Sequence, residues 1–161
     1  MNDSPTIVGV VPTDVLLSYT GLDFLQAIID GKLPGPPIAQ TLGFSLIEVE
    51  HGRAVFAGIP EQRHLNPIGT IHAGFAATLL DSAVACAVHS TLAKGEGYTT
   101  LELKLNLVRA LTPDVGRVTA EGRIIHRGRT TATSEGSLRD AAGRLYAHAS
   151  TTCLIFPANA R

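Results

Sequence analysis

One acidic residue stands alone in an apolar part of the chain. Between Arg63 and Lys94 the sequence is rich in Ala and Leu, and Asp81 is the only formally charged side chain there. An ionised carboxylate in apolar surroundings is costly unless it has hydrogen-bond donors, an opening to water or a chemical task. We therefore interpret Asp81 as a candidate catalytic carboxylate. The alternative is a local hydrogen bond within the helix, although Asp has a poor propensity for helix interiors.

The stretch around Asp81 predicts a long helix that is apolar on every side. Gly, Thr and His residues open this stretch, and it closes near Gly95. A helix of this composition is buried, so other elements must cover it. A shorter helix is predicted over residues 22–29, while residues 1–18 carry no clear period and are expected to form a loose arm.

Alternating residues and turn residues predict an antiparallel sheet around this helix. Residues 101–107 alternate apolar and polar without a fault, which is typical of a half-buried strand. The other predicted strands cover residues 42–50, 53–59, 117–126, 130–138 and 144–156. One long helix among such strands indicates an α+β fold in which the sheet wraps around the helix.

Composition restricts the classes of function. The chain has 161 residues, 45% of them hydrophobic, and a formal net charge of −1, so we expect a globular protein without a nucleic-acid-binding surface. Cys86 and Cys153 lie in no CxxC pattern and are expected to be small core residues. The histidines form no metal-binding pattern, so no metal is expected. Without a secretory signal or an apolar span, we expect a cytoplasmic protein that is not bound to a membrane.

Three motifs together resemble the hotdog-fold acyl-CoA thioesterases of the PaaI-like branch, which includes the phenylacetate-pathway enzymes and thioesterase-superfamily member 2. They are His64-Leu-Asn66-Pro-Ile-Gly69-Thr-Ile-His72-Ala-Gly74 with Asp81 downstream, Asn106-Leu-Val-Arg109, and His126-Arg-Gly128-Arg129-Thr130. The resemblance implies a hotdog fold, an antiparallel sheet wrapped around one long central helix. It divides the chain into an N-terminal arm with a short helix (1–39) and a thioesterase domain (40–161).

The resemblance also implies roles for individual residues. Asp81 matches the acid that attacks the thioester or activates water, and Ala73 stands where the family has a glycine whose N–H binds the thioester oxygen. Asn66 would hold the carbonyl or the water, although Asn before Pro also favours a turn. Thr100 would orient the water. His72 is expected to order the loop before the helix, with catalysis as the alternative.

Coenzyme A is expected to bind as part of the substrate, and no separate cofactor is expected. Guanidinium groups match phosphate oxygens, and a glycine turn lets the backbone approach the pantetheine arm. The candidates are Arg109, Arg127, Gly128, Arg129 and Thr130, the alternative for the arginines being ordinary solvated surface residues.

The resemblance implies an enzyme that hydrolyses an aryl- or medium-chain acyl-CoA to a free acid and CoA. Its active sites lie between two subunits, so at least a homodimer is expected, and a homotetramer as the full assembly. The alternative is a non-catalytic hotdog protein that binds acyl-CoA without turnover.

Overall fold

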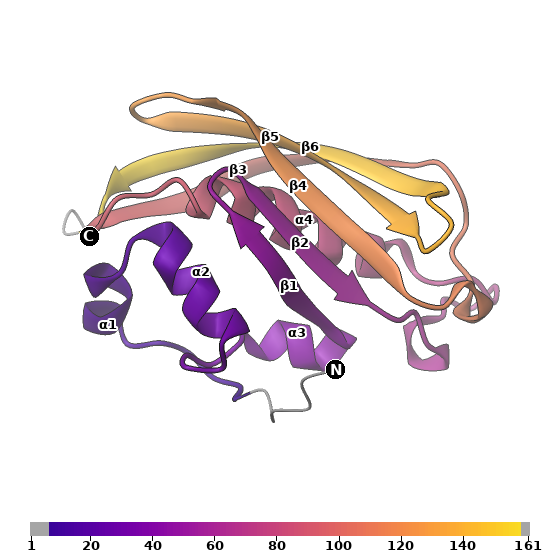
Figure 1. Cartoon of the computed structure of the whole chain (residues 1–161). Helices are drawn as coiled ribbons and strands as arrows, with labels where there is room; N and C mark the ends of the chain where they lie inside the picture. The colour runs from indigo at the N-terminus through magenta and orange to yellow at the C-terminus, as the bar shows by residue number, and fades with distance from the viewer. Residues whose placement is uncertain (1–6, 159–161) are drawn as a thin grey trace.

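The computed structural model describes residues 7–158, where a curved sheet wraps around one long helix (Figure 1). The sheet has six strands in the order β1-β2-β4-β5-β6-β3, and all neighbours are antiparallel. The long helix is α4 (Ala73–His89), and it packs against β2, β4, β5 and β6. The α+β architecture predicted from the sequence is confirmed. The strands are β1 (Phe44–Glu50), β2 (Arg53–Gly58), β3 (Glu96–Leu107), β4 (Val118–Arg127), β5 (Thr131–Asp140) and β6 (Leu145–Pro157).

Two facing glycines allow α4 to lie very close to the sheet. Gly122 and Gly136 are partners in the β4–β5 ladder. A Cβ atom on Gly122 would lie 2.2 Å from the Ala83 carbonyl oxygen, and one on Gly136 would lie 2.8 Å from Val84. The buried Ser134 hydroxyl also donates a hydrogen bond to the Val84 carbonyl at 2.7 Å. The position of α4, and so of Asp81, is therefore fixed by direct contact with the sheet backbone.

The predicted strands are confirmed with shifted ends. The first hairpin turns at His51-Gly52, where Gly52 has a φ of +80°. Strand β3 begins at Glu96, before the predicted start at residue 101, and its register shifts between Thr100 and Glu102. The register shift marks a β-bulge, and Leu101 between these residues is 56% exposed.

Three short helices precede the sheet: α1 (Thr13–Ser18), α2 (Gly21–Ile29) and α3 (Pro37–Leu42). The prediction of α2 is confirmed, and the Thr20 hydroxyl caps it by accepting a hydrogen bond from Asp23 N–H. The expectation of a loose arm over residues 1–18 is wrong for α1, and residues 1–6 lie outside the described part. Helix α3 was not predicted and contains Leu42, which had been assigned to a strand. The domain boundary at residues 39 and 40 stays a prediction.

Strand β3 is a long edge of the sheet. Among residues 7–158 it pairs with β6 alone, so its other side presents unpaired backbone groups. Leu101, Leu107 and the following Val108 are each more than half exposed. Long edge strands with exposed apolar residues favour pairing with another strand.

Candidate active site

A tight turn leads the chain into α4. The Asn66 carbonyl accepts a hydrogen bond from Gly69 N–H at 3.1 Å, and Gly69 has a φ of +84°. Pro67 occupies the second position of this turn, where its fixed φ is favourable. The turn expected from the Asn-Pro pair is confirmed.

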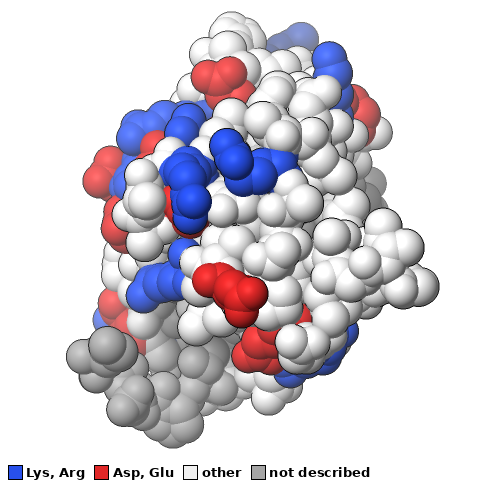
Figure 2. Space-filling model, turned by 90° about the vertical axis from the view of Figure 1, so that its right-hand side faces the viewer, with Lys and Arg blue, Asp and Glu red and all other residues white. Residues whose placement is uncertain are grey.

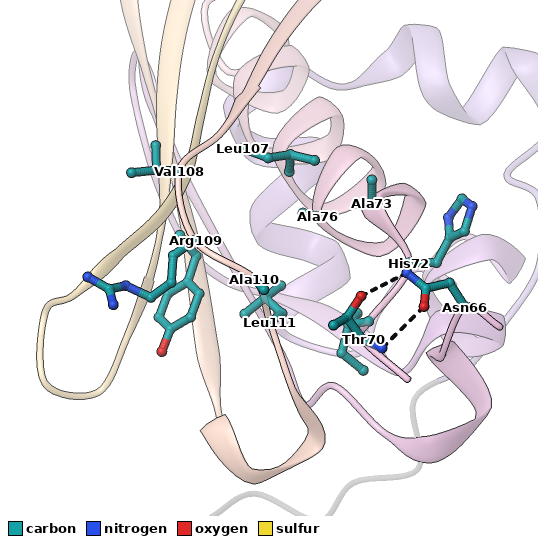
Figure 3. A pocket seen from close by; sticks show the side chains of 12 residues that line it. Asn66, Thr70, His72, Ala73, Ala76, Leu107, Val108, Arg109, Ala110 and Leu111 are labelled. Carbon is teal, nitrogen blue, oxygen red and sulfur yellow. Dashed lines mark hydrogen bonds between the residues drawn. The ribbon is translucent and has the colours of Figure 1, made fainter. Parts of the chain in front are cut away.

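The Asn66 side chain holds this loop together. Its Oδ1 accepts hydrogen bonds from the N–H groups of Ile68 and Thr70, both at 3.1 Å, and its Nδ2 donates to Thr70 Oγ1 at 2.8 Å. Figure 3 shows the two bonds between Asn66 and Thr70. The amide oxygen is thus used within the loop. One N–H of Nδ2 is left for another partner, so Asn66 has a structural role and retains one donor. Thr70 was not identified from the sequence, where nothing distinguishes it.

His72 and Ala73 form the N-terminus of α4. His72 is the N-cap residue: its Nδ1 accepts a hydrogen bond from Gly74 N–H at 2.9 Å, and its own N–H donates to the His64 carbonyl at 2.8 Å. The expected loop-ordering role of His72 agrees with these bonds. No group within residues 7–158 accepts a hydrogen bond from the Ala73 N–H. This free donor sits where the helix dipole favours negative charge.

A cavity of about 320 Å³ opens beside this helix end, and we call it the loop cavity. Asn66, Thr70 and His72 border it from the loop, and Arg109 borders it from the strand side (Figure 3). The Arg109 guanidinium lies over the ring of Tyr146, 5.9 Å from its centre. The loop cavity thus brings together four of the predicted site residues, namely Asn66, His72, Ala73 and Arg109.

Asp81 does not line the loop cavity. It lies eight residues after Ala73 on the same helix, which corresponds to about 12 Å along the axis. The side chain is half-buried, and burial raises the pKa of its carboxyl group. No hydrogen-bond or ion-pair partner within residues 7–158 compensates this burial. The carboxylate therefore has the desolvated, unpartnered environment expected of a reactive group.

Thr100 on β3 and Asp81 on α4 are both near the thiol of Cys153 on β6. Thr100 pairs with Cys153 in the β3–β6 ladder, and its side chain acts to lower the pKa of the Cys153 thiol, against the larger effect of burial. The Asp81 charge contributes to the raised pKa of that thiol, after the larger effect of burial. Thr100 and Asp81 are thus both near Cys153, and the predicted role of Thr100 in orienting water stays a prediction.

The predicted phosphate-binding residues 127–130 form the turn between β4 and β5. One terminal nitrogen of Arg127, Nη2, contacts both carboxylate oxygens of Glu96, at 2.8 and 2.9 Å, and the other, Nη1, donates to the Gly128 carbonyl. Arg129 and Thr130 are exposed. This turn lies near Glu96, where β3 begins, whereas the loop cavity lies beyond Leu107, about 36 Å away along the strand. A single protomer therefore does not bring the two groups together.

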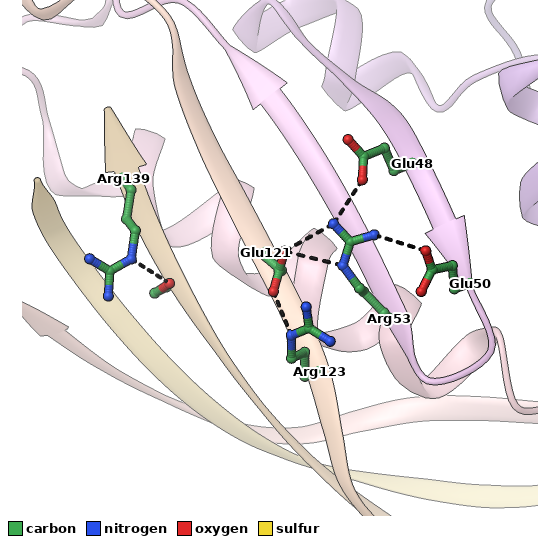
Figure 4. A network of polar contacts seen from close by, with 7 residues as sticks. Glu48, Glu50, Arg53, Glu121, Arg123 and Arg139 are labelled. Carbon is green, nitrogen blue, oxygen red and sulfur yellow. Dashed lines mark hydrogen bonds and ion pairs between the residues drawn. The ribbon is translucent and has the colours of Figure 1, made fainter. Parts of the chain in front are cut away.

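Other charged side chains form ion pairs on the sheet. Arg53 contacts Glu48 at 2.7 Å, Glu50 at 3.5 Å and Glu121 at 3.0 Å, and Glu121 also pairs with Arg123 (Figure 4). Figure 2 shows the end of the molecule that lies on the right in Figure 1, where basic and acidic side chains are interspersed. These contacts join β1, β2 and β4 and involve none of the predicted site residues.

Residues 7–158 contain neither a metal-binding cluster nor a membrane-spanning helix. No group of three or more His, Cys, Asp or Glu side chains in this part is arranged to hold a metal ion. None of its helices has the length and apolar character needed to cross a bilayer.

Comparisons with known proteins show the family to which the chain belongs. The family model of the thioesterase superfamily matches residues 68–147, which include Ala73, Asp81 and Arg109. A Caenorhabditis elegans protein named as a putative esterase is 32% identical over 151 residues, covering 90% of this chain and 88% of its own. The 1,4-dihydroxy-2-naphthoyl-CoA hydrolase of Listeria monocytogenes is 26% identical over 108 residues, covering 67% of this chain and 86% of its own.

Solved structures of similar fold also point to thioesterases. A phenylacetic acid degradation-related protein from Ralstonia eutropha JMP134 has a TM-score of 0.74 and 29% identity, covering 81% of this chain and 98% of its own. A variant of the phenylacetic acid degradation protein PaaI from Thermus thermophilus has a TM-score of 0.66 and 31% identity, covering 73% and 97%. The chain therefore belongs to the thioesterase superfamily, as a hotdog thioesterase of the PaaI type, and is a thioester hydrolase.

Proposed function

We propose that the protein hydrolyses the CoA thioester of an uncharged aryl or medium-chain acid, with Asp81 as general base or nucleophile. The reaction is R–CO–S–CoA plus water to R–COOH plus CoA–SH. The observation that carries the proposal is the half-buried Asp81 carboxylate without a partner on a helix that has no other charged side chain. The names of the Listeria hydrolase and of the phenylacetic acid proteins support an aryl acyl group.

The proposed active site is built from two subunits. A thioester carbonyl must lie about 3 Å from both the reacting group and the oxyanion donor. Within one protomer the Ala73 N–H and Asp81 are separated by about 12 Å of helix, so they do not serve the same carbonyl. Asp81 of one copy is therefore paired with Ala73 of another copy.

The free edge of β3 supports such a dimer. Antiparallel pairing of two β3 edges would place the Glu96 end of one strand beside the Leu107 end of the other. The 127–130 turn of one copy would then approach the loop cavity of the second copy. Arg129 of the first copy and Arg109 of the second would both be available to coenzyme A phosphates. Pairing of such dimers into a tetramer is part of the same proposal.

The chemistry follows from the groups at this junction. The ionised Asp81 removes a proton from water or attacks the carbonyl carbon itself, and the carbonyl oxygen becomes negative. The Ala73 N–H donates to that oxygen, while the remaining Asn66 N–H and the Thr100 hydroxyl orient reactants. The carbon–sulfur bond then breaks. In the general-base route, the hydroxide has added to the carbonyl carbon, and the CoA thiolate takes up the proton that Asp81 removed from water. In the nucleophilic route, water hydrolyses the acyl-Asp81 anhydride, which releases the acid, restores Asp81 and supplies the proton for the thiolate.

Thiol release from a panel of acyl-CoA substrates tests the proposal. We expect phenylacetyl-, benzoyl- and octanoyl-CoA to be hydrolysed with kcat/KM at least 10-fold above malonyl-CoA. Burial alone shifts the pKa of Asp81, and no cation among the described residues acts on it that could hold a second carboxylate. The absence of release from every acyl-CoA, in a folded preparation, would contradict the proposal.

A second prediction concerns Arg129, which is exposed and has no ion-pair partner among the described residues. Replacing it with Ala is expected to raise KM for acyl-CoA about 5- to 100-fold and to leave kcat nearly unchanged, because a phosphate contact is equal in ground and transition states. With acyl-pantetheine the effect should disappear. The control is Arg123→Ala, since Arg123 pairs with Glu121 on the sheet. Equal KM values in wild type and Arg129→Ala would remove Arg129 from the CoA site.

A further inference from the structure

A second cavity, larger than the loop cavity, lies beneath the N-terminal helices. It has a volume of about 900 Å³, and we call it the N-terminal cavity. Its walls come from α1, α2 and the 34–37 segment on one side, from β1 and β2 on another, and from α4 and β3 at its inner end. Cavities of this size typically hold a small-molecule ligand. Nothing in residues 7–158 fills it.

The lining of the N-terminal cavity is apolar and carries no formal charge. Its side chains include Leu16, Ile28 and Leu46, and none of the described residues that line it is Asp, Glu, Lys or Arg. Its polar side chains are the uncharged Gln40 and Ser45, and, near the inner end, the Cys86 thiol, the His89 imidazole and the Tyr98 phenol.

These polar groups stay neutral near pH 7. Burial lowers the pKa of His89 to about 4 and raises that of Cys86 to about 12. Burial also raises the pKa of the Tyr98 phenol. The occupant that fits is an uncharged, mainly apolar group, because a charged group would be desolvated here without a partner.

Three aromatic rings from separate elements form the inner wall. The His89 ring is stacked on Phe24 of α2 with centres 5.2 Å apart, and it lies 5.1 Å from the ring of Tyr98 on β3. Helix α2 is also tied to the end of α4, since Gly21 N–H donates to the Leu92 carbonyl at 2.9 Å. The N-terminal helices therefore close the cavity as a fixed wall.

Asp81 does not itself line the N-terminal cavity, and the inner end of the cavity at Cys86 lies about 7.5 Å from it along α4. Cys86 and His89 follow Asp81 by five and eight residues, on the part of the helix that the sheet leaves half-exposed. The Asp81 charge contributes, after burial, to the raised pKa of both Cys86 and Tyr98. A carbonyl carbon held at Asp81 thus has an apolar space beside it, along the helix and away from the Ala73 end.

We infer that the N-terminal cavity binds the acyl group of the thioester, which extends from Asp81 past Cys86 towards His89 and the wall formed by α1 and α2. This inference rests on the proposed function and specifies its substrate. The acyl group is an uncharged chain or ring, and the N-terminal helices of this chain set the length that is accepted. Acyl groups ending in a carboxylate are excluded.

Binding of nonhydrolysable S-alkyl-CoA thioethers tests this inference without turnover. For the wild-type protein, calorimetry is expected to give at least 10-fold tighter binding of S-octyl-CoA than of S-ethyl-CoA, because the longer chain buries more methylene groups. An S-alkyl chain of equal length that ends in a carboxylate should lose this gain. Equal affinities for the ethyl and octyl compounds would overturn the inference. This test uses the wild-type protein alone.

Matched variants test whether the alkyl chain of the ligand binds in the N-terminal cavity. Ile28→Trp places a large ring in the cavity, whereas Gln26→Trp places the same ring on the exposed side of α2. We expect the octyl-to-ethyl affinity ratio to fall at least 5-fold in Ile28→Trp and to stay at the wild-type value in Gln26→Trp. Cys86→Phe, compared with the near-isosteric Cys86→Ser, tests the inner end independently if Ile28→Trp does not fold.

The results separate this inference from the proposed function. If filling the cavity leaves the affinity ratio unchanged while octanoyl-CoA hydrolysis still depends on Asp81, the inference is wrong and the proposed function stands. If the ratio responds to the filling variants but no acyl-CoA is hydrolysed, the inference holds as a binding site and the proposed function fails.

Discussion

Replacing Asp81 with Asn is expected to lower kcat for acyl-CoA hydrolysis by a factor of about 10² to 10⁴, which is typical for loss of a positioned acid or base. Asn has nearly the same shape, and the Asp81 carboxylate makes no hydrogen bond within residues 7–158 that the exchange would break. Steady-state thiol release with the most active acyl-CoA measures the effect. Near-wild-type turnover would remove Asp81 from the mechanism.

The neighbouring Ser82 provides the control. Its hydroxyl is half-buried and donates to the Thr78 carbonyl at 2.8 Å within the helix. Ser82→Ala should therefore keep kcat within a few-fold of wild type, because a bond back to the helix backbone contributes little. An equal loss in both variants would indicate general damage to α4 rather than loss of a catalytic group.

The same Asp81→Asn variant should be more stable than wild type at neutral pH. Burial raises the pKa of Asp81 above the value of about 3.9 for an unfolded chain. The native state therefore binds more protons than the unfolded state between these two pKa values, and wild-type stability falls as the pH rises through that window. The denaturation midpoint of Asp81→Asn should exceed that of wild type at pH 7, and the difference should shrink as the pH falls towards 3.9. A pH-independent loss of stability in Asp81→Asn would contradict this expectation.

Local patterns were sufficient to predict the elements that position the site. The Ala- and Leu-rich run predicted α4, the alternation at residues 101–107 predicted the central part of β3, and the Asn66-Pro67 pair predicted the turn before α4. Each signal depends on neighbours in the sequence, which is why it is visible without the fold. The isolation of Asp81 is likewise visible from the sequence alone, because its apolar neighbours are on the same helix.

The features that were missed depend on contacts between distant segments or on ambiguous local signals. Pro36-Pro37 is an ambiguous signal for α3, because Pro interrupts a helix but is also favoured in its first turn, where α3 begins. The bulge at Leu101 is set by pairing with β6. The ion pair between Arg127 and Glu96 joins residues 31 positions apart. The N-terminal cavity depends on α2, which folds back against β1 and α4, and on Leu16 of α1, which also lines it.

Ala73→Pro is expected to lower kcat about 10²- to 10³-fold, as for removal of one oxyanion donor. Ala73 is the first residue of α4, a position at which Pro is favoured in helices. His72 has φ −59° and ψ 136°, the extended conformation that residues adopt before Pro. The exchange thus removes the free N–H without breaking the helix. Ala73→Gly keeps the N–H, so its kcat should remain well above that of Ala73→Pro. Equal kcat values for wild type and Ala73→Pro would exclude this N–H as the donor.

Mixing the two inactive variants tests whether the site is shared between subunits. In a heterodimer of Asp81→Asn and Ala73→Pro, one site combines both substitutions, and the other combines the intact Asp81 with the intact Ala73 N–H. Random pairing of equal amounts, after unfolding and refolding together, should therefore restore about a quarter of wild-type activity. Each variant refolded alone provides the baseline. Sites contained within one protomer would give no gain on mixing, because every protomer in the mixture would still lack one of the two groups.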